Sequence, residues 1–131
     1  MRHALAEAHC APHEVEWICA HGSSTPLNDD TEVHAIGEVF SEHTAKVPMS
    51  GTKGWHAHAL GATGAIEAAI AALVMTRGWI PPTLNCVDPA SGTGLRHVPE
   101  RGLTERPAAV LKNSFGFGGC NATLVLRDGS M

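Results

Sequence analysis

Two histidines stand at positions in this sequence where side chains can do chemistry. His21 follows the apolar run VEWICA directly, and His58 precedes a long apolar run with helical spacing. Sheets of the α/β class place binding residues outside the carboxyl ends of their strands, and the positive end of a helix dipole keeps a nearby imidazole neutral. A neutral ring donates one hydrogen bond, so the two histidines could converge on one substrate oxygen. In a chain with nine histidines, the alternative is that both are solvated or structural.

Glu67 is the carboxylate that most needs an explanation. It lies inside the apolar segment AIEAAIAALVM, where an unpaired carboxylate would cost several kcal/mol. Lys53 belongs to the glycine-rich segment just before, and that segment could fold back to bring the ammonium group of Lys53 to Glu67. The alternative is that Glu67 reaches solvent through a gap in the packing.

The run SFGFGGCN, residues 114–121, alternates glycine with two phenylalanines immediately after an expected strand. Glycine lets the backbone bend sharply, while the aromatic rings can act as movable walls of a site. A movable gate and a plain glycine turn between two strands explain the pattern equally well. The run is not a dinucleotide-binding fingerprint, because GxGxxG is absent and no helix is expected to follow.

Metal binding is the rival interpretation of the histidines. His56 and His58 form an HxH pair and His9 adjoins Cys10, but neither cluster has a spacing typical of zinc sites. We therefore expect no metal.

Composition and charge exclude several other classes of protein. The net charge of -4 leaves no basic stripe for nucleic acid and no polybasic membrane anchor. Four cysteines without CxxC spacing indicate reduced thiols in the cytoplasm. No signal-peptide pattern opens the chain, and the apolar segment around Glu67 is short for a bilayer span. We expect a cytoplasmic protein that binds neither nucleic acid nor membrane.

The elements that must position these residues alternate between helix and strand and end in several strands. Periodicity and turn residues predict helices over about 4–8, 29–40 and 62–77, and strands over about 15–20, 46–50, 83–86, 95–98, 108–113 and 122–127. Asp29 or Asp30 is expected to cap the second helix. The third is apolar on every side and is expected to be buried, and DPASGTG is expected to be an exposed loop. This order indicates one α/β domain with partly parallel pairing and a terminal antiparallel ribbon.

Taken together, these segments resemble the C-terminal half of the β-ketoacyl-acyl-carrier-protein synthases, which are condensing enzymes with the thiolase fold. HGSSTPLNDDTE resembles the family's HGTxT segment and its acidic residues, GTKGWHAHALGATGAIE resembles TK…GHxxGAAG…E, and NSFGFGGCNA resembles the NSFGFGGxN gate. The resemblance covers nearly the whole chain. It implies a single C-terminal domain over 1–131, built as a βαβαβββ-type layer of mixed sheet with one buried helix.

By this resemblance, His21 and His58 match the family's two active-site histidines, Lys53 matches its lysine and Glu67 the carboxylate partner of that lysine. Ala57 stands where the family usually has glycine before the second histidine. A positive φ at Ala57 would strain the backbone by about 1 kcal/mol.

The resemblance also implies residues that contact substrate. Ser23 and Thr25 match the hydroxyl residues that hydrogen-bond the phosphopantetheine arm, with serine in place of the usual threonine at position 23. Phe117 matches the gating phenylalanine, and Phe115 lies beside it in the same segment.

The implied activity is that of a 3-oxoacyl-acyl-carrier-protein synthase, an acyltransferase of fatty-acid or polyketide synthesis. It performs a decarboxylative Claisen condensation of malonyl-acyl-carrier protein with an acyl thioester. It needs no cofactor, since phosphopantetheine on the carrier protein holds the substrate. The family's nucleophilic cysteine belongs to the N-terminal half, and none of the four cysteines here has a matching context. This chain alone is therefore expected to be inactive.

The implied partners are acyl-carrier protein and the missing N-terminal half, in a homodimer or heterodimer. Such a half would expose apolar surface that favours association. One alternative is a non-catalytic half-domain that binds acyl-carrier protein or a synthase subunit, as a chain-length factor does. Another is a thiolase that uses coenzyme A, although the paired histidine motifs and the gate favour the synthases.

Overall fold

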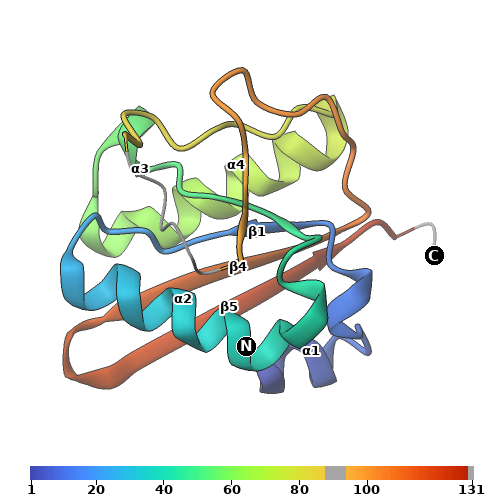
Figure 1. Ribbon diagram of the computed structural model, residues 1–131, viewed down its shortest axis with the longest axis horizontal. Helices are drawn as coiled ribbons and strands as arrows, with labels where there is room; N and C mark the ends of the chain where they lie inside the picture. Colours follow the sequence, from blue (N-terminus) through green and yellow to red (C-terminus); the bar gives the residue numbers. More distant parts are fainter. Residues whose placement is uncertain (88–93, 130–131) are drawn as a thin grey trace.

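The computed structural model describes residues 1–87 and 94–129 of the chain (Figure 1). Its helices are α1 (Arg2–Glu7), α2 (Pro26–Phe40), α3 (Lys53–His56) and α4 (Thr63–Arg77). Its strands are β1 (Trp17–Cys19), β2 (Pro48–Ser50), β3 (Arg96–His97), β4 (Ala109–Gly116) and β5 (Cys120–Arg127). The loop DPASGTG predicted from the sequence lies outside the described residues except for its last glycine.

The five strands form one mixed sheet in the order β3-β2-β1-β4-β5. β1 pairs in parallel with β2 and β4, and β2 pairs in parallel with β3. β5 runs antiparallel to β4 along its whole length. The predicted βαβαβββ order, with partly parallel pairing and a terminal antiparallel ribbon, is confirmed.

Helices cover both faces of this sheet. Because side chains alternate between faces along a strand, Ile18 and Leu111 pack with apolar side chains of α1 and α2, whereas Trp17 and Val110 pack with those of α4. Figure 1 shows α1 and α2 on one side of the strands and α4 on the other. Strands that are buried on both faces have nearly continuous apolar sequences. This explains why VEWICA does not alternate regularly between apolar and polar residues.

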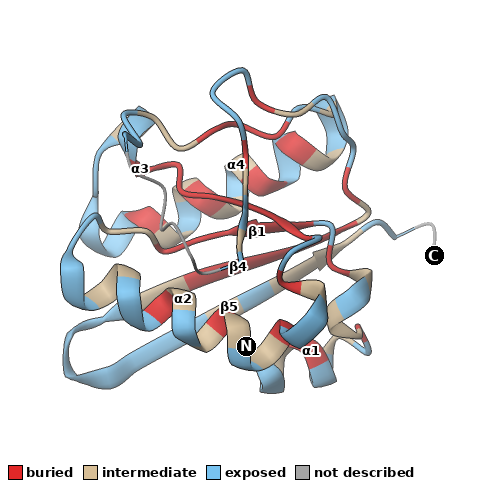
Figure 2. Cartoon of the chain, in the orientation of Figure 1, coloured by how far each residue is buried: buried red, intermediate tan, exposed pale blue. Residues whose placement is uncertain are grey.

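α4 is buried on one face only, which differs from the expectation of a fully buried helix. Its buried residues recur at helical spacing and face the sheet: Thr63, Glu67, Ala71 and Val74. Leu73 on the opposite face is 54% exposed, and Leu60 in the turn before the helix is 72% exposed. Figure 2 shows this outer side of the helix in pale blue. The sheet covers one side of α4, and no other layer of the described chain covers the second.

The helical stretch Leu60–Arg77 is long and apolar enough to cross a membrane by length and composition alone. This stretch is longer than the apolar segment AIEAAIAALVM, which the sequence analysis described as short for a bilayer span. The carboxylate of Glu67 lies in its middle, fully buried against the sheet. A core helix of a folded domain passes the same test of length and composition.

The predicted start of the second helix is wrong. α2 begins at Pro26 with Thr25 at the N-cap, so neither Asp29 nor Asp30 caps it. Proline is favoured in the first turn because its missing N–H has no helical acceptor there anyway.

The predicted strand over 83–86 is absent. Two prolines precede it and cannot donate to a sheet ladder. Asn85 has φ +57°, which is incompatible with an extended strand. The side chain of Thr83 instead accepts a hydrogen bond from the amide of Gly51 at 2.9 Å.

Candidate active site

His21 follows β1 after one residue, Ala20, at the carboxyl end of the strand, and is 6% exposed. Its backbone N–H and that of Gly22 donate to the two carboxylate oxygens of Glu32, each at 2.9 Å. Asn113 of β4 donates from Nδ2 to the same carboxylate at 3.0 Å. Glu32 is itself buried on α2. One buried carboxylate therefore holds the loop that carries His21.

His58 lies between α3 and α4, and the structure brings it to His21. The two ring centroids are 5.4 Å apart, and the rings meet edge to face at 80°. The backbone N–H of Leu60 points at Nδ1 of His58 at 3.3 Å, and Thr63 Oγ1 lies 2.9 Å from the same nitrogen. A backbone N–H can only donate, so Nδ1 must accept. The ring is then neutral, with its proton on Nε2.

The environment of His21 keeps its ring neutral as well. Burial, followed by the charge of Lys53, lowers the pKa of His21 to about 4, against a weaker opposing effect of Glu67. At neutral pH, this imidazole therefore carries one N–H donor. Its Nδ1 has no hydrogen-bond partner among the described residues.

Glu67 has cations on both sides. Lys53 Nζ lies 2.6 Å from Oε1 and Lys112 Nζ lies 2.8 Å from Oε2, and all three side chains are nearly or fully buried. The contact with Lys112 is an ion pair without the alignment of a hydrogen bond. Lys53 also donates to the carbonyl oxygen of His21. The predicted contact between Lys53 and Glu67 is confirmed, and Glu67 does not reach solvent.

The residues predicted to contact substrate do not all lie at the histidine pair. Ser23 and Thr25 lie in the loop after His21, and their hydroxyl oxygens are 2.9 Å apart. The ring of Phe115 lies 5.7 Å from that of His21. Phe117 is fully exposed in the turn between β4 and β5, so the structure does not bring it to the histidines.

Ala57, next to His58, has φ +60° and ψ 178°. Glycine populates this region freely, whereas a Cβ strains it by about 1 to 3 kcal/mol. The positive φ considered for the sequence is therefore present, on the residue that sets the direction of His58.

The four thiols differ in burial. Cys19 is fully buried, and desolvation together with Glu67 raises its pKa to about 12. Burial also raises the pKa of Cys10, whereas Cys86 and Cys120 are exposed. Within residues 1–87 and 94–129, no group of three or more His, Cys, Asp or Glu side chains could hold a metal ion. His56 instead contacts Thr52.

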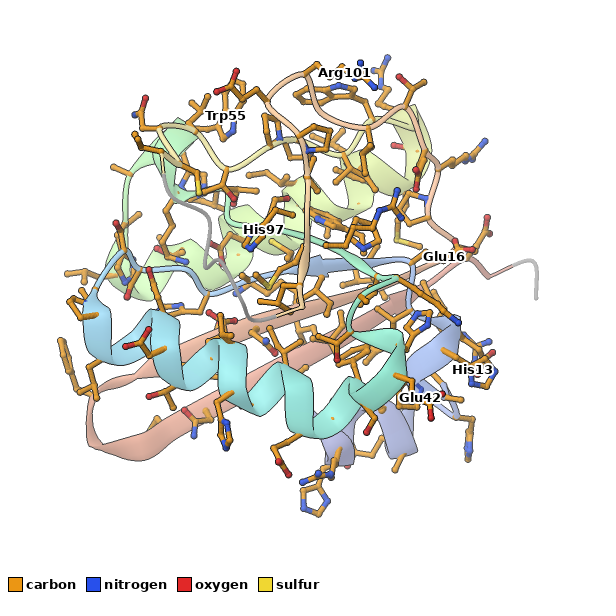
Figure 3. The ribbon with its side chains drawn as sticks, viewed as in Figure 1. His13, Glu16, Glu42, Trp55, His97 and Arg101 are labelled. Atoms are coloured by element: carbon orange, nitrogen blue, oxygen red, sulfur yellow. The ribbon has the colours of Figure 1, made fainter. Side chains whose placement is uncertain are left out.

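A polar hollow of about 440 Å³ lies away from the histidine pair. Figure 3 labels His13 and Glu16 in its wall. Its other lining residues include His43, Lys46, Arg96, Glu105 and Arg106. None of the site residues predicted from the sequence lines it.

Sequence reasoning missed Glu32 and Lys112. Glu32 precedes Ile36 and Phe40 by four and eight residues, so helical spacing places it on the buried stripe of α2. Lys112 follows the apolar pair Val110 and Leu111 within an expected strand. A charged residue in each of these positions was a signal for a buried partner.

The family profile described as "Beta-ketoacyl synthase, C-terminal domain" matches residues 1–87. The curated protein 3-oxoacyl-(acyl-carrier-protein) synthase 2 of Coxiella burnetii is 43% identical over 126 residues, which cover 96% of this chain and 30% of that protein. Nodulation protein E of Rhizobium leguminosarum bv. trifolii is 38% identical over 128 residues, 98% of this chain and 32% of that protein. The chain thus spans about a third of the length of these curated relatives.

Solved structures of ketosynthases have the same architecture. A β-ketoacyl synthase from Burkholderia phymatum STM815 matches with a TM-score of 0.88 at 32% identity, covering 97% of this chain and 31% of that one. A structure of a type II PKS acyl-carrier protein in complex with its ketosynthase matches with a TM-score of 0.90 at 35% identity, covering 96% and 31%. The fold is therefore thiolase-like, and the chain belongs to the β-ketoacyl synthase family as a C-terminal domain of that family.

Proposed function

We propose that this chain supplies the histidine-bearing half of a 3-oxoacyl-acyl-carrier-protein synthase. The whole enzyme condenses malonyl-acyl-carrier protein with an acyl thioester in fatty-acid or polyketide synthesis. The observation that carries the proposal is the meeting of two neutral imidazoles, His21 and His58, with ring centroids 5.4 Å apart. Neutral rings act as hydrogen-bond donors toward an oxygen without bringing a full charge to the site.

The proposed chemistry begins with decarboxylation of the malonyl thioester. The bond between its α-carbon and its carboxylate breaks, carbon dioxide leaves, and the electron pair forms an enolate with charge on the thioester oxygen. His58, from Nε2, and His21 donate hydrogen bonds to that oxygen. Preorganised donors of this kind contribute roughly 3 kcal/mol each to the stabilisation of the transition state.

In the second step, the enolate carbon attacks an acyl group held as a thioester on a cysteine. The new carbon–carbon bond forms and the cysteine leaves as a thiolate. We place that cysteine in the N-terminal half, because Cys19, whose pKa Glu67 and Lys53 both influence, is fully buried and has a raised pKa. A buried thiol with a pKa of about 12 carries almost no thiolate at neutral pH.

Ser23 and Thr25 are proposed to bind the phosphopantetheine arm, and Phe115 and Phe117 to line the path of the acyl chain. The adjacent hydroxyls of Ser23 and Thr25 offer both donors and acceptors to the amides of the arm. Phe115 already borders His21. Phe117 must swing with its glycine-flanked turn to take part, since its side chain is fully exposed.

The proposed partners are acyl-carrier protein and a cysteine-bearing half, within a dimeric synthase of the cytoplasm. Residues 1–131 form one domain of that enzyme and do not condense substrates alone. The exposed apolar face of α4 supports the need for a second layer.

The test uses the longest chain that the gene encodes, with a cysteine-bearing partner where that half is encoded separately. Release of labelled carbon dioxide from malonyl-acyl-carrier protein is measured. His58→Ala is expected to slow release about 100-fold or more. The matched control His34→Ala, at an exposed histidine of α2, leaves the rate unchanged. Equal rates for the two variants would overturn the proposed role of the histidine pair.

A non-catalytic subunit is the second candidate. One structural relative, with a TM-score of 0.82 at 33% identity, is a ketosynthase in complex with its chain length factor. The strained backbone at Ala57, beside His58, supports this candidate. If the complete protein binds a ketosynthase and releases no carbon dioxide, this second function replaces the first.

A further inference from the structure

Lys112 is a fully buried lysine of β4 to which the proposed chemistry assigns no role. Its ammonium group lies 2.8 Å from Oε2 of Glu67 and donates to the hydroxyl of Ser114. Lys53 occupies the other oxygen of the same carboxylate. Two cations therefore share one anion in a buried region.

The charges of this cluster do not cancel. Counted as two ammonium groups and one carboxylate, Lys53, Glu67 and Lys112 together carry a net charge of one positive unit. The other buried carboxylate beside His21, that of Glu32, accepts hydrogen bonds from two backbone N–H groups and from Asn113, which are neutral donors. It makes no ion pair with Lys53 or Lys112 and is not part of this cluster. A buried charge is costly unless it is paired and hydrogen-bonded, so the presence of a second buried ammonium group calls for an explanation.

The excess charge lies beside the histidine pair. Lys53 donates to the carbonyl oxygen of His21, so the cluster touches the backbone of that residue. The charged or titratable groups that face His21 are Lys53 of α3, Glu67 of α4, Lys112 of β4, Glu32 of α2 and His58. Without Lys112, Lys53 and Glu67 would form a neutral pair.

We propose that Lys112 is a positioning residue that gives the buried cluster of Lys53, Glu67 and Lys112 its net positive charge next to His21. This charge has two effects, one on the proton of His21 and one on a bound oxygen. It disfavours a proton on His21, which stays a neutral donor, and it favours negative charge on an oxygen bound there. The second effect rests on the function proposed above, and the first does not.

Net charge can be separated from packing by three variants. Lys112→Met keeps an unbranched side chain that is one atom shorter, and it leaves the cluster neutral. Lys112→Met combined with Glu67→Gln restores one positive unit, carried by Lys53 alone. Glu67→Gln alone leaves two positive units. Lys46→Met, at an exposed lysine outside the site, is the matched control.

The first measurement is the titration of His21 by NMR in histidine-labelled protein, using the longest chain that the gene encodes. The midpoint for His21 is expected to rise in Lys112→Met, to return toward the wild-type value in the double variant, and to fall in Glu67→Gln. Lys46→Met should leave it unchanged. An unchanged midpoint in Lys112→Met overturns the proposal, and so does a double variant that behaves like the single one, because packing would then explain the effect.

If Lys112→Met does not fold, the comparison of Glu67→Gln with the double variant remains. These two proteins differ only in the charge and hydrogen bonds of residue 112. The proposal requires a lower midpoint for His21 in Glu67→Gln, and equal midpoints would overturn it.

The second measurement is release of carbon dioxide from malonyl-acyl-carrier protein. Loss of one unit charge near the developing enolate is expected to slow release about tenfold in Lys112→Met, with partial recovery in the double variant. If the histidine titrates as expected but no variant and no wild-type protein releases carbon dioxide, the role of Lys112 stands and the proposed function fails.

Discussion

The backbone N–H of Leu60 donates to Nδ1 of His58, and this contact leaves Nε2 as the ring nitrogen that carries the proton. The direction of the donor, and therefore the position of any oxygen it binds, is set by the turn before α4.

The position of the proton on Nε2 predicts which substitution best replaces the histidine. The amide nitrogen of glutamine can take the place of Nε2, whereas that of asparagine lies closer to the place of Nδ1. His58→Gln should therefore keep more activity than His58→Asn, which should fall about 100-fold in release of carbon dioxide from malonyl-acyl-carrier protein. Equal losses would contradict the assigned tautomer.

Replacing Ala57 by glycine should stabilise the protein. Its φ of +60° with ψ of 178° strains any residue that has a Cβ. Ala57→Gly should raise the free energy of unfolding by about 1 kcal/mol, because relief of strain outweighs the extra freedom of glycine in the unfolded chain. Urea denaturation measures this. Ala59→Gly is the matched control: Ala59 is also exposed but has φ -79°, so glycine there should not stabilise.

Glu32 should be required for the loop of His21. Glu32→Gln replaces one acceptor oxygen by an amide that cannot accept, so one of the buried donors of His21, Gly22 or Asn113 loses its partner. The cost should be about 1 to 3 kcal/mol in the free energy of unfolding. Asp30→Asn, at an exposed position of the same helix, should change stability by less than about 0.5 kcal/mol. A loss of similar size in both variants would show that the three donors do not depend on this carboxylate.

Stability should fall as the pH is lowered from about 6.5 toward 4. The folded-state pKa of His21 is about 4, below the ordinary value near 6.5, so the unfolded chain binds more protons between these values. Burial lowers the pKa of His97 as well and adds to the same trend. The effect of His21 is at most a few kcal/mol. Urea unfolding at several pH values should show a shallower dependence in His21→Gln than in the wild-type protein, and an identical slope would contradict the lowered pKa.

The outer face of α4 should cause residues 1–131 to associate when they are produced alone. Leu73 lies on that face and is 54% exposed. Leu73→Lys should reduce self-association or binding to a cysteine-bearing half, as measured by sedimentation. Leu27→Lys is the control, since Leu27 is 83% exposed on α2, on the other side of the sheet. A monodisperse wild-type monomer would argue against an interface on α4.

Much of the sheet could be predicted from the sequence because the apolar runs are short and bounded by turn residues. The contact between Lys53 and Glu67 was also predictable, since a carboxylate in an apolar helix must find a cation and one lies close in sequence. Lys112 lies 45 residues beyond Glu67, and only the order of strands in the sheet brings the two together. Local pattern carries no information about that order.

The exposure of α4 was not predictable for a related reason. A helix that is apolar on every side is expected to bury all of its faces. The sequence does not say whether the same chain supplies the surfaces that bury them. Here the sheet covers Glu67 and Ala71, while Leu73 remains exposed.

Adjacent residues of β4 hold the two buried carboxylates on opposite faces of the sheet. Asn113 reaches Glu32 on α2, and Lys112 reaches Glu67 on α4. A strand turns every side chain to the other face when its register moves by one residue. Insertion or deletion of one residue early in β4 would therefore direct the lysine toward Glu32 and the asparagine toward Glu67. The position of these two residues along the strand is therefore a requirement for holding both carboxylates.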